Sequence, residues 1–317
     1  MSSAPQPSDE RAVLTALLAM QRLSWEQGVA GHAALAMGRG DLVRMIADDA
    51  VVRQDAVGRL GEVDGAGLVN CGSLVDVVDT VWRGTGDPRL RAALDRQLAW
   101  FETGCPRAPD GTMFHLAGTE QVWVDSVYML LPALFLLGRA ELAMAQLAGH
   151  RSRLQTPGGL YAARWDESTQ QLVRPALWGT GNGWVAAGLA RAWPLDGAVP
   201  HRAELAARAR EVIEACLAHR RDDGLFHDTL DDPGTFVDAA PAQMLGYAVL
   251  TAVADGWLEP SWAETGRDLR LAAGVAQDGL VRPVGGSPHF DRPGRSAEAQ
   301  AFYLLAAAAD RRVAGQD

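Results

Sequence analysis

The chain has 317 residues, 48% of them hydrophobic and 21% charged, which is enough apolar material for one large domain or two average ones. Its formal net charge of −10 argues against nucleic acid and anionic membranes as partners, because no basic surplus exists to neutralise phosphates. Three cysteines, Cys71, Cys105 and Cys216, are odd in number and far apart, so they predict neither a disulfide framework nor a metal site.

Residues 1–8 are expected to form a short disordered tail that leads into the first amphipathic helix. This N-terminus has no basic region before its apolar run, so it does not predict a signal peptide. No apolar run of the sequence reaches membrane-spanning length. We therefore expect a soluble, cytoplasmic protein with no membrane partner, and a second disordered end at residues 313–317.

Most longer segments show helical periodicity and are rich in Ala and Leu. Alternating runs of β-branched residues are nearly absent, which indicates an all-α protein. In chain order, the predicted helices are 9–38, 41–56, 73–84, 87–104, 121–137, 139–154, 182–193, 201–220, 238–255, 260–275 and 295–312.

A turn built on glycine recurs between these helices, at Gly58, Gly111, Gly159, Gly224 and Gly279, in steps of 53, 48, 65 and 55 residues. A period near 50 suits one antiparallel helix pair, so the chain holds about six pairs. An open solenoid and a closed toroid both satisfy this count. Because the alternate loops are long and carry Trp, His and Asp, we expect a single-domain (α/α)6 toroid of six helical hairpins over residues 9–312.

The segment 110–137 opens with a turn at Asp110-Gly111, passes His115 and becomes strongly apolar around Asp125. Read as a helix, it leaves little surface for water. A carboxylate in such a helix must be paired, hydrogen-bonded or protonated, and a protonated carboxyl is a usable acid. A helix N-cap or a satisfied buried Asp is the alternative interpretation of Asp125.

Four other loops combine aromatic rings with single polar groups, which is typical of sugar sites. Each also has a simpler interpretation: Trp25 fits a core position of the first helix, and His227 fits a solvated acidic loop. Residues 158–167 are expected to form a short hairpin. The candidate residues of these loops are Trp25 and Glu26 after Ser24, then Tyr161, Trp165 and Asp166, then Trp178, Asn182 and Trp184 around three glycines, and His227.

Other chemistries find little support in the sequence. The seven histidines show no metal-ligand spacing. No Gly-x-Ser-x-Gly nucleophile elbow is present, and no dinucleotide fingerprint follows a strand.

On these motifs the chain resembles the unsaturated glucuronyl and rhamnogalacturonyl hydrolases, glycoside hydrolase families 88 and 105, from about Gln21 to Ala309. The matching motifs are Ser24-Trp25-Glu26-Gln27-Gly28, Gln121-x-Trp123-Val124-Asp125-Ser126-x-Tyr128-Met129, Trp178-Gly179-x-Gly181-Asn182-Gly183-Trp184 and Ser296-Ala297-Glu298-Ala299-Gln300-Ala301-Phe302.

The resemblance implies an (α/α)6 six-hairpin glycosidase that needs no metal or organic cofactor. Its substrate would be an oligosaccharide, derived from pectin or a related polysaccharide, with a 4,5-unsaturated uronic acid at the non-reducing end. Asp125 would protonate the vinyl ether at C4, water would add at C5, and the hemiketal would collapse and release the remaining sugar. The substrate-binding residues expected from the resemblance and the loops are Trp25, His115, Tyr161, Arg174, Trp178, Asn182 and Trp184.

Four positions depart from the family pattern: Gly67 stands where an Asp is common, Ala163 where His is frequent, Thr180 where Arg is frequent, and Asp238-Ala239-Ala240 where Glu-Thr-Ser is frequent. A second carboxylate is therefore sought elsewhere, and Arg164 or Arg174 is expected to replace the missing contacts to the substrate. The candidates for that second carboxylate are Glu26, Asp64, Asp76, Asp166 and Asp238.

Two other functions stay open at this point. The toroid fits a catalytically impaired carbohydrate-binding or regulatory protein that keeps the aromatic residues without the second carboxylate. An (α/α)6 sugar epimerase needs facing histidines, for which only His115 and His227 are available. The oligomeric state and the sugar that follows the uronate are not specified by the sequence.

Overall fold

The computed structural model describes residues 7–315, and helices dominate that part of the chain. The expected disordered ends fall mostly outside it: the first helix begins at Pro7 and the last one ends at Val313. The α-helices are α1 (Pro7–Met20), α2 (Ser24–Ala36), α3 (Gly40–Val52), α4 (Val75–Thr85), α5 (Pro88–Ala99), α6 (Ser126–Leu136), α7 (Ala140–Leu154), α8 (Gly179–Ala192), α9 (Arg202–Leu217), α10 (Ala240–Ala254), α11 (Trp262–Ala272) and α12 (Ala297–Val313).

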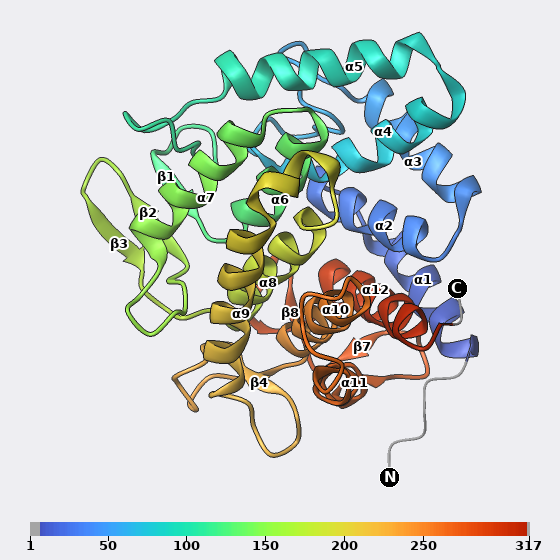
Figure 1. The fold of residues 1–317 in the computed structure, drawn as a ribbon, viewed down its shortest axis with the longest axis vertical. Coiled ribbons are helices and arrows are strands. Elements are labelled where there is room, and N and C mark those ends of the chain that lie inside the picture. Colours follow the sequence, from blue (N-terminus) through green and yellow to red (C-terminus); the bar gives the residue numbers. More distant parts are fainter. Residues whose placement is uncertain (1–6, 316–317) are drawn as a thin grey trace.

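The even-numbered helices form a closed inner ring, and the odd-numbered helices lie outside it. Around the ring α4 contacts α6, α6 contacts α8, α8 contacts α10, α10 contacts α12, and α12 returns to α2, which also contacts α4 (Figure 1). The 3-10 turn η1 (Asn70–Leu74) packs between α2 and α6 just before α4. The expectation of a six-hairpin (α/α)6 toroid is confirmed.

The inner helices α6, α8, α10 and α12 are buried on all sides, since they show buried residues along almost their entire length. Small residues let them approach closely. A Cβ on Gly72 would lie 2.1 Å from the Met129 carbonyl oxygen of α6, and a Cβ on Gly188 would lie 2.8 Å from Tyr128 Cα. The Ala- and Gly-rich composition of these segments is therefore a packing requirement of the ring. No helix within residues 7–315 is long and apolar enough to cross a membrane.

The five recurrent turn glycines all adopt positive φ, between 77° and 104°, a conformation that favours glycine. In four of these turns an amide side chain of an ensuing helix accepts a hydrogen bond from the backbone N–H two residues after the glycine. The pairs are Leu60 with Gln97, Met113 with Gln146, Tyr161 with Asn182, and Val281 with Gln300, at 2.6 to 2.9 Å.

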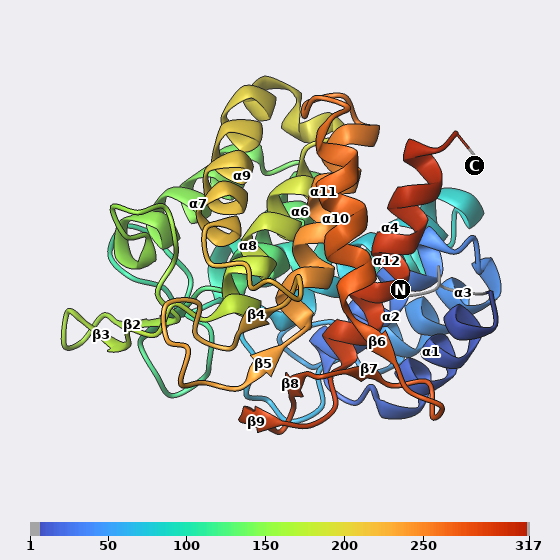
Figure 2. The same cartoon turned by 90° about the horizontal axis from the view of Figure 1, so that it is seen from below.

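The structure differs from the predicted elements in two places. The segment 9–38 is two helices, broken at residues 21–23, and the predicted helix at 121–137 starts only at Ser126. Residues 121–123 instead form the first strand of an antiparallel sheet, whose order is β1-β2-β3. Figure 2 shows the short strands gathered at one end of the helices. The strands are β1 (Gln121–Trp123), β2 (Arg164–Asp166), β3 (Gln171–Arg174), β4 (Phe226–His227), β5 (Val237–Asp238), β6 (Gly274–Val275), β7 (Val281–Arg282), β8 (Gly285–Gly286) and β9 (His289–Pro293).

Candidate active site

A cavity with about 860 Å³ of empty space, its open mouth included, lies among the loops that carry the short strands. The cavity contains most of the residues that the sequence singled out. Its lining includes Leu23, Ser24, Trp25, Glu62, Asp64, Ala66, Gly67, Asn70, His115, Leu116, Trp123, Asp125, Met129, Arg164, Arg174, Trp178, Trp184, Phe290 and Glu298.

Asp125 stands at the N-cap position of α6, yet its side chain accepts no hydrogen bond from the first turn of the helix. The preceding residue is held by the sheet, because the Val124 N–H donates to the Ala163 carbonyl oxygen at 3.1 Å. Asp125 Oδ1 is buried and has no hydrogen-bond partner. A buried carboxylate oxygen without a hydrogen-bond partner is unfavourable, so Asp125 is not the satisfied cap of the alternative interpretation.

His115 lies beside Asp125, with Nε2 3.8 Å from Asp125 Oδ2. Its Nδ1 is 2.9 Å from the Ser126 hydroxyl, which fixes the ring orientation. Burial lowers the pKa of His115, and the nearby Arg164 lowers it further, while the charge of Asp125 acts in the opposite direction. The imidazole is therefore neutral at neutral pH and offers one donor and one acceptor.

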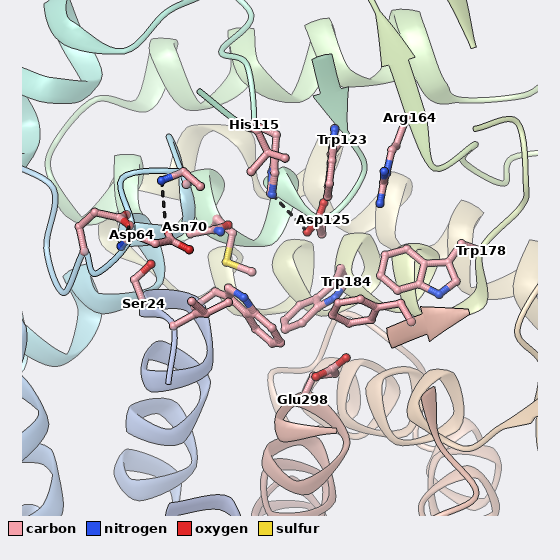
Figure 3. A pocket seen from close by; sticks show the side chains of 18 of the residues that line it. Ser24, Asp64, Asn70, His115, Trp123, Asp125, Arg164, Trp178, Trp184 and Glu298 are labelled. Carbon is pink, nitrogen blue, oxygen red and sulfur yellow. Dashed lines mark hydrogen bonds and ion pairs between the residues drawn. The ribbon is translucent and has the colours of Figure 1, made fainter. Parts of the chain in front are cut away.

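Trp123 holds His115 and Arg164 in a three-layer stack. The His115 and Trp123 rings are 4.4 Å apart and inclined by 4°, and the Arg164 guanidinium carbon lies 3.6 Å from the Trp123 ring centre. The β1–β2 register places Trp123 directly opposite Arg164. Figure 3 shows Trp123 between the other two side chains. The sheet thus orients an imidazole and a guanidinium on the same side of the cavity as Asp125.

Arg174 faces Arg164 across the β2–β3 pair, and its guanidinium lies 5.3 Å from the Trp178 ring centre. Within residues 7–315 neither guanidinium group makes a salt bridge or a hydrogen bond. Burial and the neighbouring Arg174 lower the pKa of Arg164, although a guanidinium stays charged. Two guanidinium groups that have no salt-bridge partner in the described part of the chain indicate a binding site for an anionic group in this cavity.

Indole and phenyl rings form much of the remaining lining. Trp25 meets Trp184 edge-on, with ring centres 6.3 Å apart. Phe290, on strand β9, lies 6.4 Å from Trp25 and 6.0 Å from Trp178. Trp25 is buried in the core, as its simpler interpretation expected, and it also lines the cavity.

The opposite end of the cavity is acidic, as Figure 3 shows with Asp64 far from Arg164 and Trp178. Glu62 Oε1 accepts backbone N–H groups of the following turn, whereas Oε2 is buried without a partner. Asp64 Oδ1 accepts the Ala66 N–H at 2.9 Å. Burial raises the pKa of Glu62, and the charge of Arg59 opposes this rise.

Glu298 lines the cavity from the first turn of α12, across from Asp125 in Figure 3, and is 1% exposed. Its Oε2 is buried and has no partner. Burial raises the pKa of this carboxyl to about 8, and the neighbouring Asp238 and Glu26 act in the same direction. Glu298 is thus held mostly uncharged at neutral pH.

The structure does not bring Asn182 and Tyr161 into the cavity lining. Both are buried, and Asn182 instead closes the turn after α7. Its Oδ1 accepts the Tyr161 N–H at 2.7 Å, and its Nδ2 donates to the carbonyl oxygens of Tyr161 and Trp178. Their expected role in substrate binding is therefore replaced by a role in positioning the loop that carries Trp178. The predicted residues that do meet in the cavity are Trp25, His115, Asp125, Arg174, Trp178 and Trp184.

Of the five candidates for a second carboxylate, Asp64 alone belongs to the cavity lining. Glu26 accepts the backbone N–H groups of Arg22 and Leu23 at the start of α2. Asp76 pairs with Arg191, and Asp166 accepts from Ser168 and Thr169 in the β2–β3 turn. Asp238 accepts from the Thr180 hydroxyl at 3.0 Å and from the Ala240 N–H.

Two of the departures from the family pattern therefore contact each other, because Thr180 and Asp238 share a buried hydrogen bond. Gly67 lines the cavity, and a Cβ there would lie 2.9 Å from Asn70 Nδ2. His227 is bound to Arg221 and to the Thr235 carbonyl oxygen, outside the cavity lining. It is therefore not the second histidine that an epimerase needs.

Several lining residues were not assigned a role from the sequence. Glu62 lies in a polar loop, and Phe290 stands alone in an exposed strand, so neither carries a local signal. Glu298 belongs to a motif that the sequence did single out, Ser296 to Phe302, but its direction into the cavity depends on the closure of the ring by α12.

The sequence of residues 9–273 matches the model of Glycosyl Hydrolase Family 88. A curated relative is the unsaturated rhamnogalacturonyl hydrolase YesR of Bacillus subtilis (strain 168), 27% identical over 216 residues, which are 61% of this chain and 63% of that protein. The chain thus matches less than two thirds of the length of this relative.

Solved structures share the fold. A possible member of the GH105 family from Klebsiella pneumoniae superposes with a TM-score of 0.82 at 18% identity, covering 97% of this chain and 95% of that one. The unsaturated glucuronyl hydrolase from Bacillus sp. GL1, described as responsible for the degradation of glycosaminoglycan, gives a TM-score of 0.68 at 15% identity, covering 91% and 84%.

Proposed function

The chain belongs to Glycosyl Hydrolase Family 88, and from this premise we propose that it hydrolyses oligosaccharides whose non-reducing end is a 4,5-unsaturated uronic acid. The observation that carries the proposal is Asp125, whose Oδ1 has no hydrogen-bond partner within residues 7–315 and whose side chain faces a cavity lined by two arginines and four indoles. We expect the protein to act in the cytoplasm on the small products of polysaccharide lyases.

In the proposed reaction the Asp125 carboxyl gives its proton to C4 of the C4=C5 double bond, and positive charge develops at C5 and the ring oxygen. A water molecule adds at C5 and returns a proton to Asp125. The C5 hemiketal then opens, which leaves a ketone at C5 and a hydroxyl on C1. Collapse at C1 to the aldehyde expels the next sugar. One carboxyl thus serves as acid and base, unlike the two carboxylates of ordinary glycosidases.

The surrounding residues support this assignment by their chemistry. Arg164 and Arg174 suit the uronate carboxylate, since guanidinium groups bind carboxylates through paired donors. Trp25, Trp178 and Trp184 offer flat apolar faces to a sugar ring. The neutral His115 lies beside Asp125 and suits the orientation of its carboxyl.

A second candidate function is carbohydrate binding without turnover. The observation that favours it is Gly67, because this glycine supplies no carboxylate at a cavity position where the family commonly has Asp. The two functions differ in one assay. The protein is mixed with unsaturated disaccharides produced by different polysaccharide lyases, and the ultraviolet absorbance of the double bond is followed. Loss of absorbance supports the hydrolase. Binding detected by calorimetry with unchanged absorbance across the whole panel supports the binding protein.

A further inference from the structure

The cavity is polarised along its length. At one end, the guanidinium groups of Arg164 and Arg174 are hydrogen-bond donors that have no acceptor among residues 7–315. At the other end, Glu62 Oε2 is a buried acceptor that has no donor in the same part of the chain, and Asp64 also lines the cavity. Asp125 lies between these two ends in Figure 3.

The proposed substrate has a matching polarity. Its carboxylate is attached to C5, and the next sugar is attached to C1, which is separated from C5 by the ring oxygen. A ring whose carboxylate faces Arg164 and Arg174 therefore directs the next sugar away from the arginines. Asp64 is exposed as well as lining the cavity, so the acidic end reaches the open mouth through which a longer chain extends.

We propose that Glu62 and Asp64 determine specificity for the second sugar: they accept hydrogen bonds from the hydroxyl or amino groups of an uncharged or amino sugar and exclude sulfated and uronic sugars. This inference rests on the proposed function and names the substrate class within it. Glu62 and Asp64 bind substrate and take no part in proton transfer.

The charge at this end is not cancelled by a neighbouring cation. Neither Glu62 nor Asp64 forms a salt bridge within residues 7–315. Arg59 is the cation that influences Glu62, but its guanidinium pairs with Asp55 and donates to the carbonyl oxygens of Gly65 and Gly67. An incoming sulfate therefore meets two carboxylates and no free cation, which is repulsive at short range.

The test compares two unsaturated disaccharides that differ only by a sulfate on the second sugar. For the unmodified protein we expect kcat/KM to be lower for the sulfated substrate by roughly tenfold or more, with the difference mainly in KM. The double variant Glu62→Gln/Asp64→Asn keeps side chains that can accept the turn N–H groups. It should reduce the difference to about threefold or less, while Asp231→Asn, which removes an exposed carboxylate outside the lining, should leave it unchanged.

Ionic strength supplies a second test on the unmodified protein, because screening by salt should also reduce the discrimination. Equal kcat/KM values for the two disaccharides would overturn the inference, and so would a ratio that neither the double variant nor salt changes. Failure of the proposed function has a different signature, since the unmodified protein would then turn over neither disaccharide.

Discussion

His115 Nε2 lies 3.8 Å from Asp125 Oδ2, and the residue that follows Asp125, Ser126, holds the other ring nitrogen at 2.9 Å. The imidazole is buried, neutral and stacked on Trp123. A neutral imidazole places one donor and one acceptor near the carboxyl of Asp125 without adding a charge. The position of this ring is therefore part of how the site would orient the proposed acid.

The Ser126→Ala variant tests the orientation of His115. Removal of the hydroxyl leaves Nδ1 without a partner and frees the ring to turn. We expect kcat to fall roughly 3- to 10-fold, the effect of one neutral hydrogen bond, with little change in KM. Steady-state kinetics on an unsaturated disaccharide would measure this split. An unchanged kcat would show that the Ser126 contact does not matter to the reaction.

Replacement of Arg174 tests the anion end of the cavity. In Arg174→Gln one of two unpaired cations is lost, so the uronate carboxylate binds less tightly. We expect KM to rise roughly 10- to 100-fold, the range for a hydrogen bond to a charged group, with a smaller change in kcat. Arg292→Gln, at an exposed position of β9 outside the lining, is the control. If both substitutions changed KM equally, Arg174 would not be a substrate-binding residue.

Asn182→Ala tests the structural role that replaces the expected ligand role. The variant leaves the buried Tyr161 N–H without its acceptor and removes the amide donor to the Tyr161 and Trp178 carbonyl oxygens, although the Trp178 oxygen keeps the backbone N–H of residue 182. We expect the free energy of unfolding to fall by about 1–3 kcal/mol, measured by denaturant titration. The KM of the folded protein should change little. A large rise in KM with unchanged stability would indicate that Asn182 binds the substrate.

The buried carboxyl of Glu298 predicts a pH-dependent stability. Its pKa is about 8 in the folded protein and about 4.3 in an unfolded chain. The pKa of Glu298 is raised by folding, so the protonated carboxyl contributes fully to the free energy of unfolding below the unfolded pKa. This contribution is lost as the pH rises through about 8. Glu298→Gln should therefore gain stability over the unmodified protein progressively across this window, then level off. Asp238, with a pKa of about 7, titrates in both proteins, and its repulsion with Glu298 is part of the measured difference. If the difference in the free energy of unfolding between the two proteins did not change with pH, the raised pKa of Glu298 would be contradicted.

The ring could be predicted from the sequence because its causes are local. Amphipathic periodicity marks the helices, and the five glycines mark turns that need positive φ. Asp125, His115 and the three indoles could be predicted because they sit in motifs with an unusual mixture of apolar and polar residues. Asp125 was nevertheless expected inside a helix, and the strand at 121–123 exists only because β2, far along the chain, pairs with it.

The rest of the site depends on contacts between distant segments. Glu62 and Asp64 lie in a polar turn that resembles any solvated loop until the cavity is assembled beside it. Phe290 and Glu298 reach the site only because α12 closes the ring against α2. Asn182 is the opposite case. A polar residue in a Trp- and Gly-rich loop predicts a contact with substrate, whereas the amide of Asn182 accepts a hydrogen bond from the backbone of a turn.

The most direct measurement is the rate at which Asp125→Asn consumes an unsaturated uronyl disaccharide, followed by ultraviolet absorbance. Asparagine keeps the size of the side chain but has no proton of comparable acidity to give, so we expect a loss of at least roughly 10²- to 10⁴-fold in kcat. Circular dichroism and calorimetric binding of the disaccharide should be close to those of the unmodified protein. Turnover at a rate near that of the unmodified protein would contradict the role of Asp125 as the proton donor.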